Sequence, residues 1–386
     1  MANNNENKIL NVPHLRFPEF TEEWKETKLG KIAEITKGSG ISKDRLSEYG
    51  SPCILYGELY TKYKSEIINE VYSRTELDSS LLVKSKANDV IIPCSGETAI
   101  DISTARCVPF NNILLGGDLN IIRLKNNDGG FFAYQLNGTR KKDIARVAQG
   151  VSVVHLYGEN LKHIRVYHPA IEEQKKITRL LSLIDKRIAT QNKIIEDLKK
   201  LKSAISLKML HSDSWEQFKI QDIASIGRGR VISSVEISQQ ENPLYPVYSS
   251  QTSNDGIMGY LDDFMFEGEY ISWTTDGANA GTVFYRNGKF NCTNVCGLLK
   301  LKKGFDAHFV SLVLAEATRM YVSTNLANPK LMNNTMGNIQ IRLPKLEEQK
   351  RISVVFRKLH GLLETHNSLI IKYSKQKQYL LSQMFI

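Results

Sequence analysis

The chain has 386 residues, enough for about two or three domains, and its 41% hydrophobic content is typical of a globular protein. The net charge of +10 favours a polyanionic partner, of which nucleic acid is the commonest. No run approaches ~18 apolar residues, which argues against a membrane-spanning helix.

The chain begins with MANNNENKIL, and we assign residues 1–14 to a polar N-terminal tail. This stretch lacks the basic-then-apolar order of a signal peptide, so we expect a cytoplasmic protein. The number of cysteines is odd, which makes a disulfide framework improbable in a chain of this length. A zinc site needs about four ligands, and Cys292 and Cys296 have no second Cys or His pair nearby. We therefore expect free thiols and no metal.

The tail is followed by a stretch, residues 15–168, that predicts a first mixed α/β domain. Trp24 opens WKETKLGKIAEITKGSG, a short amphipathic run that ends in a glycine turn. Apolar runs typical of buried strands are DVIIPCSGE (89–97) and LNIIRLK (119–125), and FFAYQLNG (131–138) is typical of a short helix. HIRVYHP (163–169) alternates like a strand and ends in a proline.

The second half repeats this plan over residues 211–343. Pro169 opens PAIEEQKKI, and Pro344, 175 positions later, opens PKLEEQKRI, with six of nine residues identical. Trp215 opens WEQFKIQDIASIGRGR, which matches the Trp24 segment at an offset of 191. The strand-like runs here are EYISWTTDG (269–277), CGLLKLKK (296–303) and IQIRLP (339–344), with a helical run FVSLVLAEA (309–317). The sequence therefore predicts two similar domains.

A long helical pattern follows each repeated motif, over residues 169–210 and 344–386. Apolar residues recur at alternating steps of three and four, which is the spacing of a coiled-coil seam. The predicted seam consists of Ile177, Leu181, Ile184, Ile188, Ile195, Leu198 and Ile205 in the first helix and Ile352, Phe356, Leu359, Leu363, Ile370, Tyr373 and Leu380 in the second. Each second-helix position lies 175 residues after its counterpart, and Lys202 and Lys377 are matching gaps in the seam.

These equivalent seams predict that the two helices pack on one another. Because only a short link at 210–214 leads from the first helix to the second domain, the pair should be antiparallel. The stretch from Ile177 to Met209 would span about 50 Å at about 1.5 Å per residue. The alternative, that each helix docks only on its own domain, is disfavoured by the charged residues opposite the seam. An approximate two-fold repeat suits a duplex with two different half-sites.

The sequence offers no catalytic constellation. It lacks a G-x-x-x-x-G-K-[ST] phosphate loop, an Asn-Pro-Pro-aromatic or Asp-Pro-Pro-aromatic motif and an H-E-x-x-H site. His155, His163 and His168 have no acidic partners beside them, and we expect core or surface roles for them. We therefore expect a DNA-binding protein that is not an enzyme. Two alternatives remain, a protein adaptor that does not touch DNA and an autonomous nuclease or methyltransferase.

The repeated P-x-x-E-E-Q-K-[KR]-I motif, at the head of a heptad helix after a variable domain, resembles the specificity subunit of type I restriction–modification systems. The start Trp24-x-x-x-x-Leu29-x-x-Ile32-Ala33 and the stretch Ala148-Gln149-Gly150-Val151-Ser152 also fit this family. The resemblance covers about residue 14 to residue 386. In the second half, Asn328-Pro329-Lys330-Leu331 replaces the Gln-Gly-x-Ser stretch.

The resemblance implies an α/β (α+β) fold with two target-recognition domains separated by two long helices in an antiparallel coiled coil. Each domain would read half of a split sequence in double-stranded DNA. The helices would act as a ruler and as the docking site for two methyltransferase subunits, in a complex that also holds restriction subunits. S-adenosylmethionine, ATP and magnesium would then belong to partner subunits, with no cofactor in this chain.

Residues that contact DNA need polar side chains on loops that reach the grooves or the phosphates. The candidates in glycine-punctuated loops of the first domain are Lys37, Ser39, Ser95, Thr98, Arg106, Gln149 and Ser152. Those of the second domain are Arg228, Arg230, Ser250, Thr252, Asp276, Asn294 and Lys330.

Overall fold

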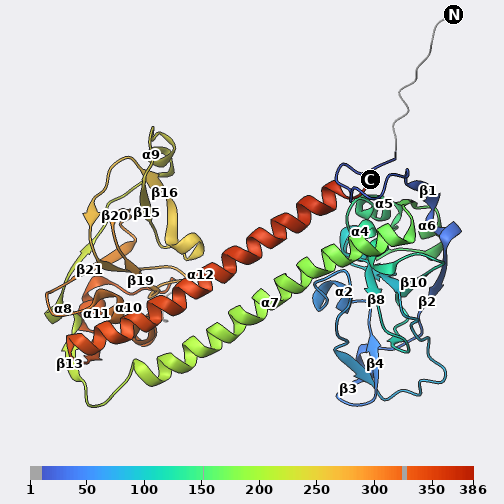
Figure 1. Cartoon of the computed structure of the whole chain (residues 1–386). Coiled ribbons are helices and arrows are strands. Elements are labelled where there is room, and N and C mark those ends of the chain that lie inside the picture. Colours follow the sequence, from blue (N-terminus) through green and yellow to red (C-terminus); the bar gives the residue numbers. More distant parts are fainter. Residues whose placement is uncertain (1–10, 151, 324–327) are drawn as a thin grey trace, which may run out of the picture. The chain divides into compact units, whose positions relative to one another are not determined.

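The computed structural model describes residues 11–150, 152–323 and 328–386 (Figure 1). The stretch MANNNENKIL and Val151, which the sequence analysis used, lie outside the described residues. The chain divides into two compact units, and each is described by itself. Unit 1 comprises residues 1–193 and 367–386, and unit 2 comprises residues 194–366. Within the described ranges, no helix is long and apolar enough to cross a membrane.

Unit 1 combines short helices with strands from two four-stranded sheets. Its strands are β1 (Lys25–Lys28), β2 (Ala33–Lys37), β3 (Leu46–Ser47), β4 (Ser51–Ile54), β5 (Ser73–Thr75), β6 (Asp89–Pro93), β7 (Ser95–Gly96), β8 (Arg106–Val108), β9 (Leu114–Leu115), β10 (Leu119–Leu124), β11 (Val154–His155) and β12 (Arg165–His168). Its short helices are α1 (Leu29–Ile32), η1 (Lys43–Arg45), α2 (Glu58–Thr61), α3 (Ala99–Ile102), α4 (Gly129–Asn137), α5 (Lys141–Val147) and α6 (Gly158–Lys162).

The central sheet of unit 1 has the order β2-β10-β6-β8 and is antiparallel throughout. A second sheet, β3-β5-β4-β9, contains the parallel pair β4 and β9. Two further antiparallel pairs join β1 to β12 and β7 to β11. The apolar runs that predicted strands at 89–97 and 119–125 thus form the two middle strands, which are buried on both faces.

Unit 2 repeats this arrangement. Its strands are β13 (Glu216–Lys219), β14 (Ala224–Arg228), β15 (Tyr245–Tyr248), β16 (Ile257–Leu261), β17 (Phe266–Glu267), β18 (Tyr270–Thr274), β19 (Val283–Arg286), β20 (Lys289–Cys292), β21 (Cys296–Leu301) and β22 (Gln340–Leu343). Its short helices are α8 (Ile220–Ile223), α9 (Ser234–Ser238), η2 (Ser253–Gly256), α10 (Ala307–Ala317), η3 (Thr318–Tyr321) and α11 (Asn333–Asn338). The sheets have the orders β14-β21-β18-β19 and β16-β15-β20-β17, and β13 pairs with β22.

The glutamine of the repeated motif has the same structural role in both units. It accepts a hydrogen bond from the backbone N–H of an N-cap aspartate and donates one to the carbonyl of the proline that precedes the long helix. These distances are 2.9 and 2.9 Å in one unit and 3.0 and 2.8 Å in the other, for Asp128, Pro169 and Gln174 and for Asp306, Pro344 and Gln349. The motif therefore fixes each long helix to the first turn of a domain helix.

The long helices are α7 (Ile171–Met209) and α12 (Leu346–Gln383). In unit 1, Asp185 of α7 lies 2.6 Å from Lys377 of α12, and Arg187, further along α7, lies over the ring of Tyr373, which is earlier on α12. The two helices therefore run antiparallel there, as the sequence predicts.

The predicted seam is buried or half-buried along its length. All fourteen seam residues are described, and none of their side chains is exposed; Ile177, Leu181 and Phe356 are at most 1% exposed. In unit 1, Ile177 and Leu181 share one hydrophobic core with Trp24 of the domain and Leu380 of α12. In unit 1 the helices thus pack on one another as well as on the domain, so the alternative that each helix docks only on its own domain is excluded there.

Candidate nucleic-acid interface

A turn at residues 116–118, here called turn 1, brings several strand ends of unit 1 together. Ser39, just after β2, donates its backbone N–H to the carbonyl of Leu115 at 2.9 Å. Cys94, just after β6, donates to the carbonyl of Asp118 at 2.8 Å and accepts from Leu156 at 2.7 Å. Turn 1 is therefore held between the ends of β2 and β6.

The turn at residues 293–295, here called turn 2, has the same setting in unit 2. Arg230, after β14, donates to the carbonyl of Cys292 at 3.1 Å. Thr275, after β18, donates to Val295 at 3.1 Å and accepts from Leu331 at 2.8 Å. The three backbone hydrogen bonds around turn 1 thus recur around turn 2, although the two turns differ in sequence.

A glycine makes the close approach at each turn possible. A Cβ at Gly38 would lie 1.9 Å from the carbonyl oxygen of Gly116, and a Cβ at Gly229 would lie 1.6 Å from that of Cys292. Both contacts involve backbone, which cannot move aside like a flexible side chain. The glycines of Lys37-Gly38 and Arg228-Gly229, near the ends of the matching Trp24 and Trp215 segments, are therefore explained by this packing, because only glycine fits there.

Most of the predicted DNA-contacting residues of unit 1 lie around turn 1. Ser95 pairs with His155 between β7 and β11, and Gln149 pairs with His155 on the other side through backbone hydrogen bonds of 2.9 and 2.7 Å. The side chains of Lys37, Ser95, Gln149 and Ser152 have no hydrogen bond or ion pair with any described residue. Their polar groups are thus available to a ligand.

Two other candidates in unit 1 already have partners within the protein. The Ser39 hydroxyl accepts a hydrogen bond from the backbone of Val83 at 2.8 Å. Thr98 caps α3, where its hydroxyl accepts from the backbone of Asp101 at 3.1 Å and donates to the carboxylate at 2.6 Å. These contacts are sufficient to explain both residues structurally.

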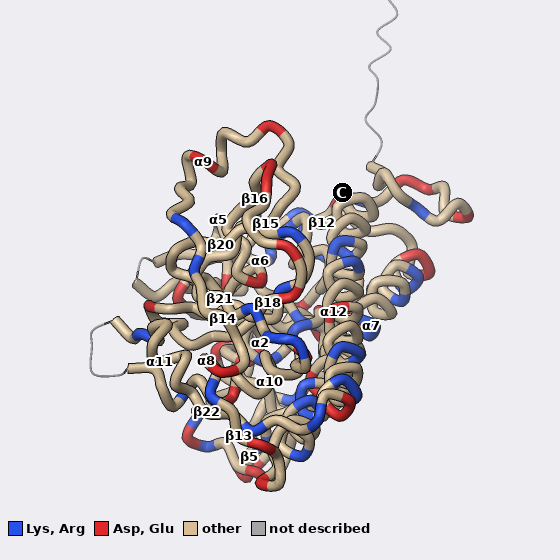
Figure 2. The backbone as a smooth tube through the Cα atoms, turned by 90° about the vertical axis from the view of Figure 1, so that its left-hand side faces the viewer, with Lys and Arg blue, Asp and Glu red and all other residues tan. Residues whose placement is uncertain are grey.

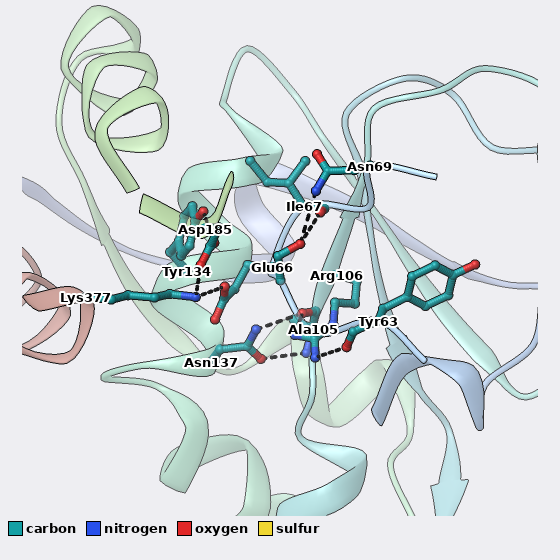
Figure 3. A network of polar contacts seen from close by, with 11 residues as sticks. Tyr63, Glu66, Ile67, Asn69, Ala105, Arg106, Tyr134, Asn137, Asp185 and Lys377 are labelled. Carbon is teal, nitrogen blue, oxygen red and sulfur yellow. Dashed lines mark hydrogen bonds and ion pairs between the residues drawn. The ribbon is translucent and has the colours of Figure 1, made fainter. Parts of the chain in front are cut away.

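Arg106 was wrongly predicted to lie in an exposed loop. It belongs to β8, is 8% exposed, and donates to the backbone carbonyls of Tyr63 at 2.9 Å and Ala105 at 3.2 Å (Figure 3). Burial lowers the pKa of its guanidinium, while the carboxylates of Glu66 and Asp185 act in the opposite direction. An arginine held in this way cannot reach a DNA groove.

Arg106 is part of a buried polar cluster, here called the lysine cluster, that joins the domain of unit 1 to both long helices (Figure 3). Lys377 of α12 lies 2.5 Å from Glu66 and 2.6 Å from Asp185 of α7, and the hydroxyl of Tyr134 donates to Asp185 at 2.7 Å. Burial raises the pKa of Asp185, and Lys377 opposes this shift. The seam gap at Lys377 is thus filled by ion pairs.

The candidates of unit 2 also surround turn 2, and they divide in the same way. Arg230 forms an ion pair with Glu236, Arg228 donates to Asn333 at 2.9 Å, and Thr275 donates to the carboxylate of Asp276 at 3.2 Å. The candidates whose side chains have no hydrogen bond or ion pair with a described residue are Ser250, Thr252, Asn294 and Lys330. Lys330 pairs through its backbone with Asp276, as His155 pairs with Ser95 in unit 1.

These backbone pairings place Lys330 and Leu331 where His155 and Leu156 stand in unit 1, so the Asn-Pro-Lys-Leu stretch does not occupy the place of the Gln-Gly-x-Ser stretch, contrary to the sequence alignment. Ser323, which donates its backbone N–H to Lys330 at 3.0 Å, holds the position that Gln149 has beside His155.

Several residues beside turn 1 were missed by the sequence analysis. A cavity of about 910 Å³ is lined by residues that include Lys43, Tyr56, Tyr60, Gly117 and Asp118. The carboxylate of Asp118 is exposed and has no hydrogen bond or ion pair with a described residue. The pair Gly116-Gly117 directly before a strand-like run was the sequence signal that could have located this turn.

The excess positive charge lies mainly on the long helices rather than at the two turns. Helix α7 contains ten Lys or Arg and five Asp or Glu, and α12 contains seven and three (Figure 2). The two helices thus account for nine of the ten net charges. Net charge alone is therefore weak support for DNA contact by the domains, and the arrangement around the turns must be judged by its geometry.

The potential metal-ligating side chains of the described residues do not gather into one place. No group of three or more His, Cys, Asp or Glu side chains in the described ranges could hold a metal ion. The five cysteines, Cys53, Cys94, Cys107, Cys292 and Cys296, are free and buried, as predicted. Burial raises the pKa of Cys53 and Cys94 to about 11, which keeps these thiols protonated near neutral pH.

Comparison with known proteins agrees with this repeated architecture. The type I restriction modification DNA specificity domain matches residues 21–200 and matches again over residues 212–372. The chain belongs to this family. The resemblance seen in the repeated Glu-Glu-Gln motif is therefore confirmed, and the chain is a type I restriction–modification specificity subunit.

Two relatives from Mycoplasma pneumoniae illustrate the similarity. A putative type I specificity subunit is 35% identical over 233 residues, which are 58% of this chain and 97% of the relative. The specificity subunit of the type I restriction enzyme MpnII is 41% identical over 177 residues, which are 44% of this chain and 53% of that subunit.

Solved structures share the fold. The type I restriction–modification S subunit from M. genitalium aligns with a TM-score of 0.74 at 17% identity, over 97% of this chain and 99% of that one. A chain from a study of complex assembly and conformational transition of the type I system aligns with a TM-score of 0.52 at 14% identity, over 94% and 97%. The predicted fold class, two mixed α/β domains with two long coiled-coil helices, is confirmed.

Proposed function

We propose that this specificity subunit reads a bipartite sequence in double-stranded DNA, one half-site with each unit. The observation that carries the proposal is the same backbone arrangement around turn 1 and turn 2, with different side chains on it. A common scaffold with different polar groups suits two half-sites that differ in sequence, since base edges are distinguished by their donors and acceptors.

The long helices would dock two methyltransferase subunits, and the complete complex would include restriction subunits. The helices have positive excess charge and exposed apolar side chains such as Leu183 and Leu207 on α7 and Val354 and Ile371 on α12. Large exposed apolar side chains beside charged ones are common at protein interfaces.

In this proposal the chain is not an enzyme. Catalysis would belong to the partner subunits, which would hold S-adenosylmethionine, ATP and magnesium. Purified chain, free of partners, should therefore neither methylate nor cleave DNA when supplied with S-adenosylmethionine and magnesium. Methyl transfer by such a preparation would contradict this part of the proposal.

Methylome mapping with a domain exchange tests DNA reading directly. Cells would carry the methyltransferase subunit together with this chain or with a chimera whose residues 211–343 come from a relative. The exchange should change one half-site of the methylated sequence and leave the other half-site unchanged. A change in both half-sites would show that the units do not read independently, and methylation without sequence preference would refute DNA reading.

Binding to DNA also separates this function from that of a protein adaptor. Contacts with phosphates release counterions, so affinity for a cognate duplex should fall steeply as salt rises. An adaptor that makes no DNA contact would show no cognate binding at any salt concentration.

A further inference from the structure

Turn 1 and turn 2 occupy equivalent backbone positions but present different chemistry. Turn 1 has the sequence Gly-Gly-Asp, and turn 2 has Thr-Asn-Val. Each turn follows the strand that pairs in parallel, β9 or β20, and precedes the central strand, β10 or β21. The sequence difference therefore sits at one defined place in a repeated scaffold.

Asp118 is the exposed acidic residue of turn 1. Its backbone carbonyl is fixed by the hydrogen bond from Cys94, while its carboxylate points to no described partner and borders the 910 Å³ cavity. Lys37 lies on the adjacent strand end, one residue before Gly38, which donates to the Leu119 carbonyl at 3.0 Å. A fixed backbone with a free carboxylate is the arrangement that a specific hydrogen bond requires.

Asn294 is the exposed polar residue of turn 2, and its side chain also has no hydrogen bond to a described residue. The neighbouring Arg230 is occupied by its ion pair with Glu236. Asn294 can therefore donate and accept at the tip of the turn while the neighbouring arginine is held by the protein.

We propose that turn 1 and turn 2 contact base edges, and that Asp118 and Asn294 are specificity-determining residues of the two half-sites. The proposal rests on DNA reading as proposed above. A carboxylate only accepts hydrogen bonds, so Asp118 would select an exocyclic amino group, such as N4 of cytosine, in the major groove. The amide of Asn294 can donate and accept together, which suits the N6 and N7 edge of adenine.

The rigid setting of the turns strengthens this assignment. Gly38 and Gly229 bring the end of β2 or β14 against the carbonyls of each turn, where a Cβ would clash. Each turn is also fixed at both ends by backbone hydrogen bonds, which join Gly116 to Ile54 and Asp118 to Cys94 in unit 1 and Thr293 to Tyr248 and Val295 to Thr275 in unit 2. A side chain on such a turn meets the duplex at a reproducible place, so its identity can set a base preference.

Selection from randomised duplexes tests the proposal with the assembled complex of this chain and the methyltransferase subunits. The variants are Asp118→Asn and Asn294→Asp. The first adds a hydrogen-bond donor to turn 1 and the second removes the donor from turn 2, with little change in side-chain size. Glu70→Gln is the matched control, since it removes an exposed charge from the loop that follows Glu66, which pairs with Lys377 of α12. Thermal melts confirm that each complex is folded.

Asp118→Asn should change the preferred base at one or two adjacent positions of one half-site by about tenfold or more, and Asn294→Asp should do so in the other half-site. Glu70→Gln should give the wild-type preference. An unchanged preference with either variant, or binding that is weaker at every sequence by the same factor, would overturn the proposal for that turn. If the wild-type complex selects no sequence, DNA reading itself fails, which is a distinct result.

Discussion

Removal of Lys377 should destabilise unit 1 strongly, because its ammonium is the common partner of two buried carboxylates. The side chains of Lys377, Glu66 and Asp185 are 14%, 11% and 8% exposed. A Lys377→Met substitution keeps most of the side-chain volume but leaves both carboxylates without this partner. Loss of one member of a buried ion pair costs about 3–5 kcal/mol.

For Lys377→Met we expect a loss of stability near the lower end of the range of about 3–5 kcal/mol. Arg106 remains close enough for Glu66 and Asp185 to raise its pKa, so it supplies part of the missing positive charge. We therefore expect a loss of about 3 kcal/mol in the free energy of unfolding of unit 1. For a unit of about 200 residues this corresponds to a fall in Tm of roughly 6–12 °C.

Calorimetry of the purified chain measures this change. Lys375→Met, on the exposed side of the same helix, is the control and should change the free energy of unfolding by less than about 0.5 kcal/mol. The double variant Lys377→Met with Asp185→Asn should recover part of the loss, because one buried charge is removed. Equal melting of the Lys377→Met variant and the control would refute the reasoning.

The free energy of unfolding of the Lys377→Met variant should depend on pH in a defined direction. Burial already raises the pKa of Asp185, and the loss of Lys377 removes an interaction that lowers it. The folded state then binds a proton more readily than the unfolded state, so the free energy of unfolding rises as the pH falls through the folded pKa. The deficit relative to wild type should therefore be smaller in mildly acidic buffer than at neutral pH.

Three further predictions follow from other parts of the structure. Ile188→Asp, in the seam, should cost several kcal/mol because it buries an unpaired charge, whereas Arg187→Asp removes only the contact with the Tyr373 ring and should cost about 1 kcal/mol or less; equal thermal melts would contradict the seam. Burial lowers the pKa of His308 to about 4, so unit 2 should lose stability as the pH falls from about 6.5 towards 4. Melts at a series of pH values should show a flatter dependence for His308→Gln, and an unaltered slope would exclude this histidine as the cause. A four-residue insertion in α7 beside Gln191 adds about 6 Å of helix and should widen the unspecified gap by about one or two base pairs, with the same bases recognised. Methylome mapping of an active variant with an unchanged gap would disprove the ruler.

The elements that were predicted correctly from the sequence are those with a regular spacing of apolar residues. The apolar run around Ile121 predicted a buried strand, and the step of three and four through Ile177 and Leu181 predicted the seam, because burial imposes these spacings directly. The short strands of the second sheet, such as β3 and β9, have only two residues each, which is too short for a period to be recognised.

Long-range contacts account for what the sequence could not give. Arg106 stands in a polar stretch that is typical of a loop, yet its partner is the carbonyl of Tyr63, 43 residues earlier. Lys377 was recognised as a gap in the seam, but its partner Glu66 is 311 residues away. At the candidate interface, the pairing of Ser95 with His155 places residues together that no local pattern connects.

The contacts of residues 367–386 with unit 1 affect how the chain folds while it is being synthesised. The ribosome makes the domain of unit 1 before unit 2, but residues 367–386, which complete the core of unit 1, only after unit 2. Until then Trp24 and Phe131 lack the ring of Phe385, which packs against both. Glu66 likewise lacks its ion-pair partner, Lys377. A nascent chain must therefore shield an unfinished first domain while the second is being translated. A stop codon a few residues before Lys377 would therefore damage the domain that lies before unit 2 in the chain.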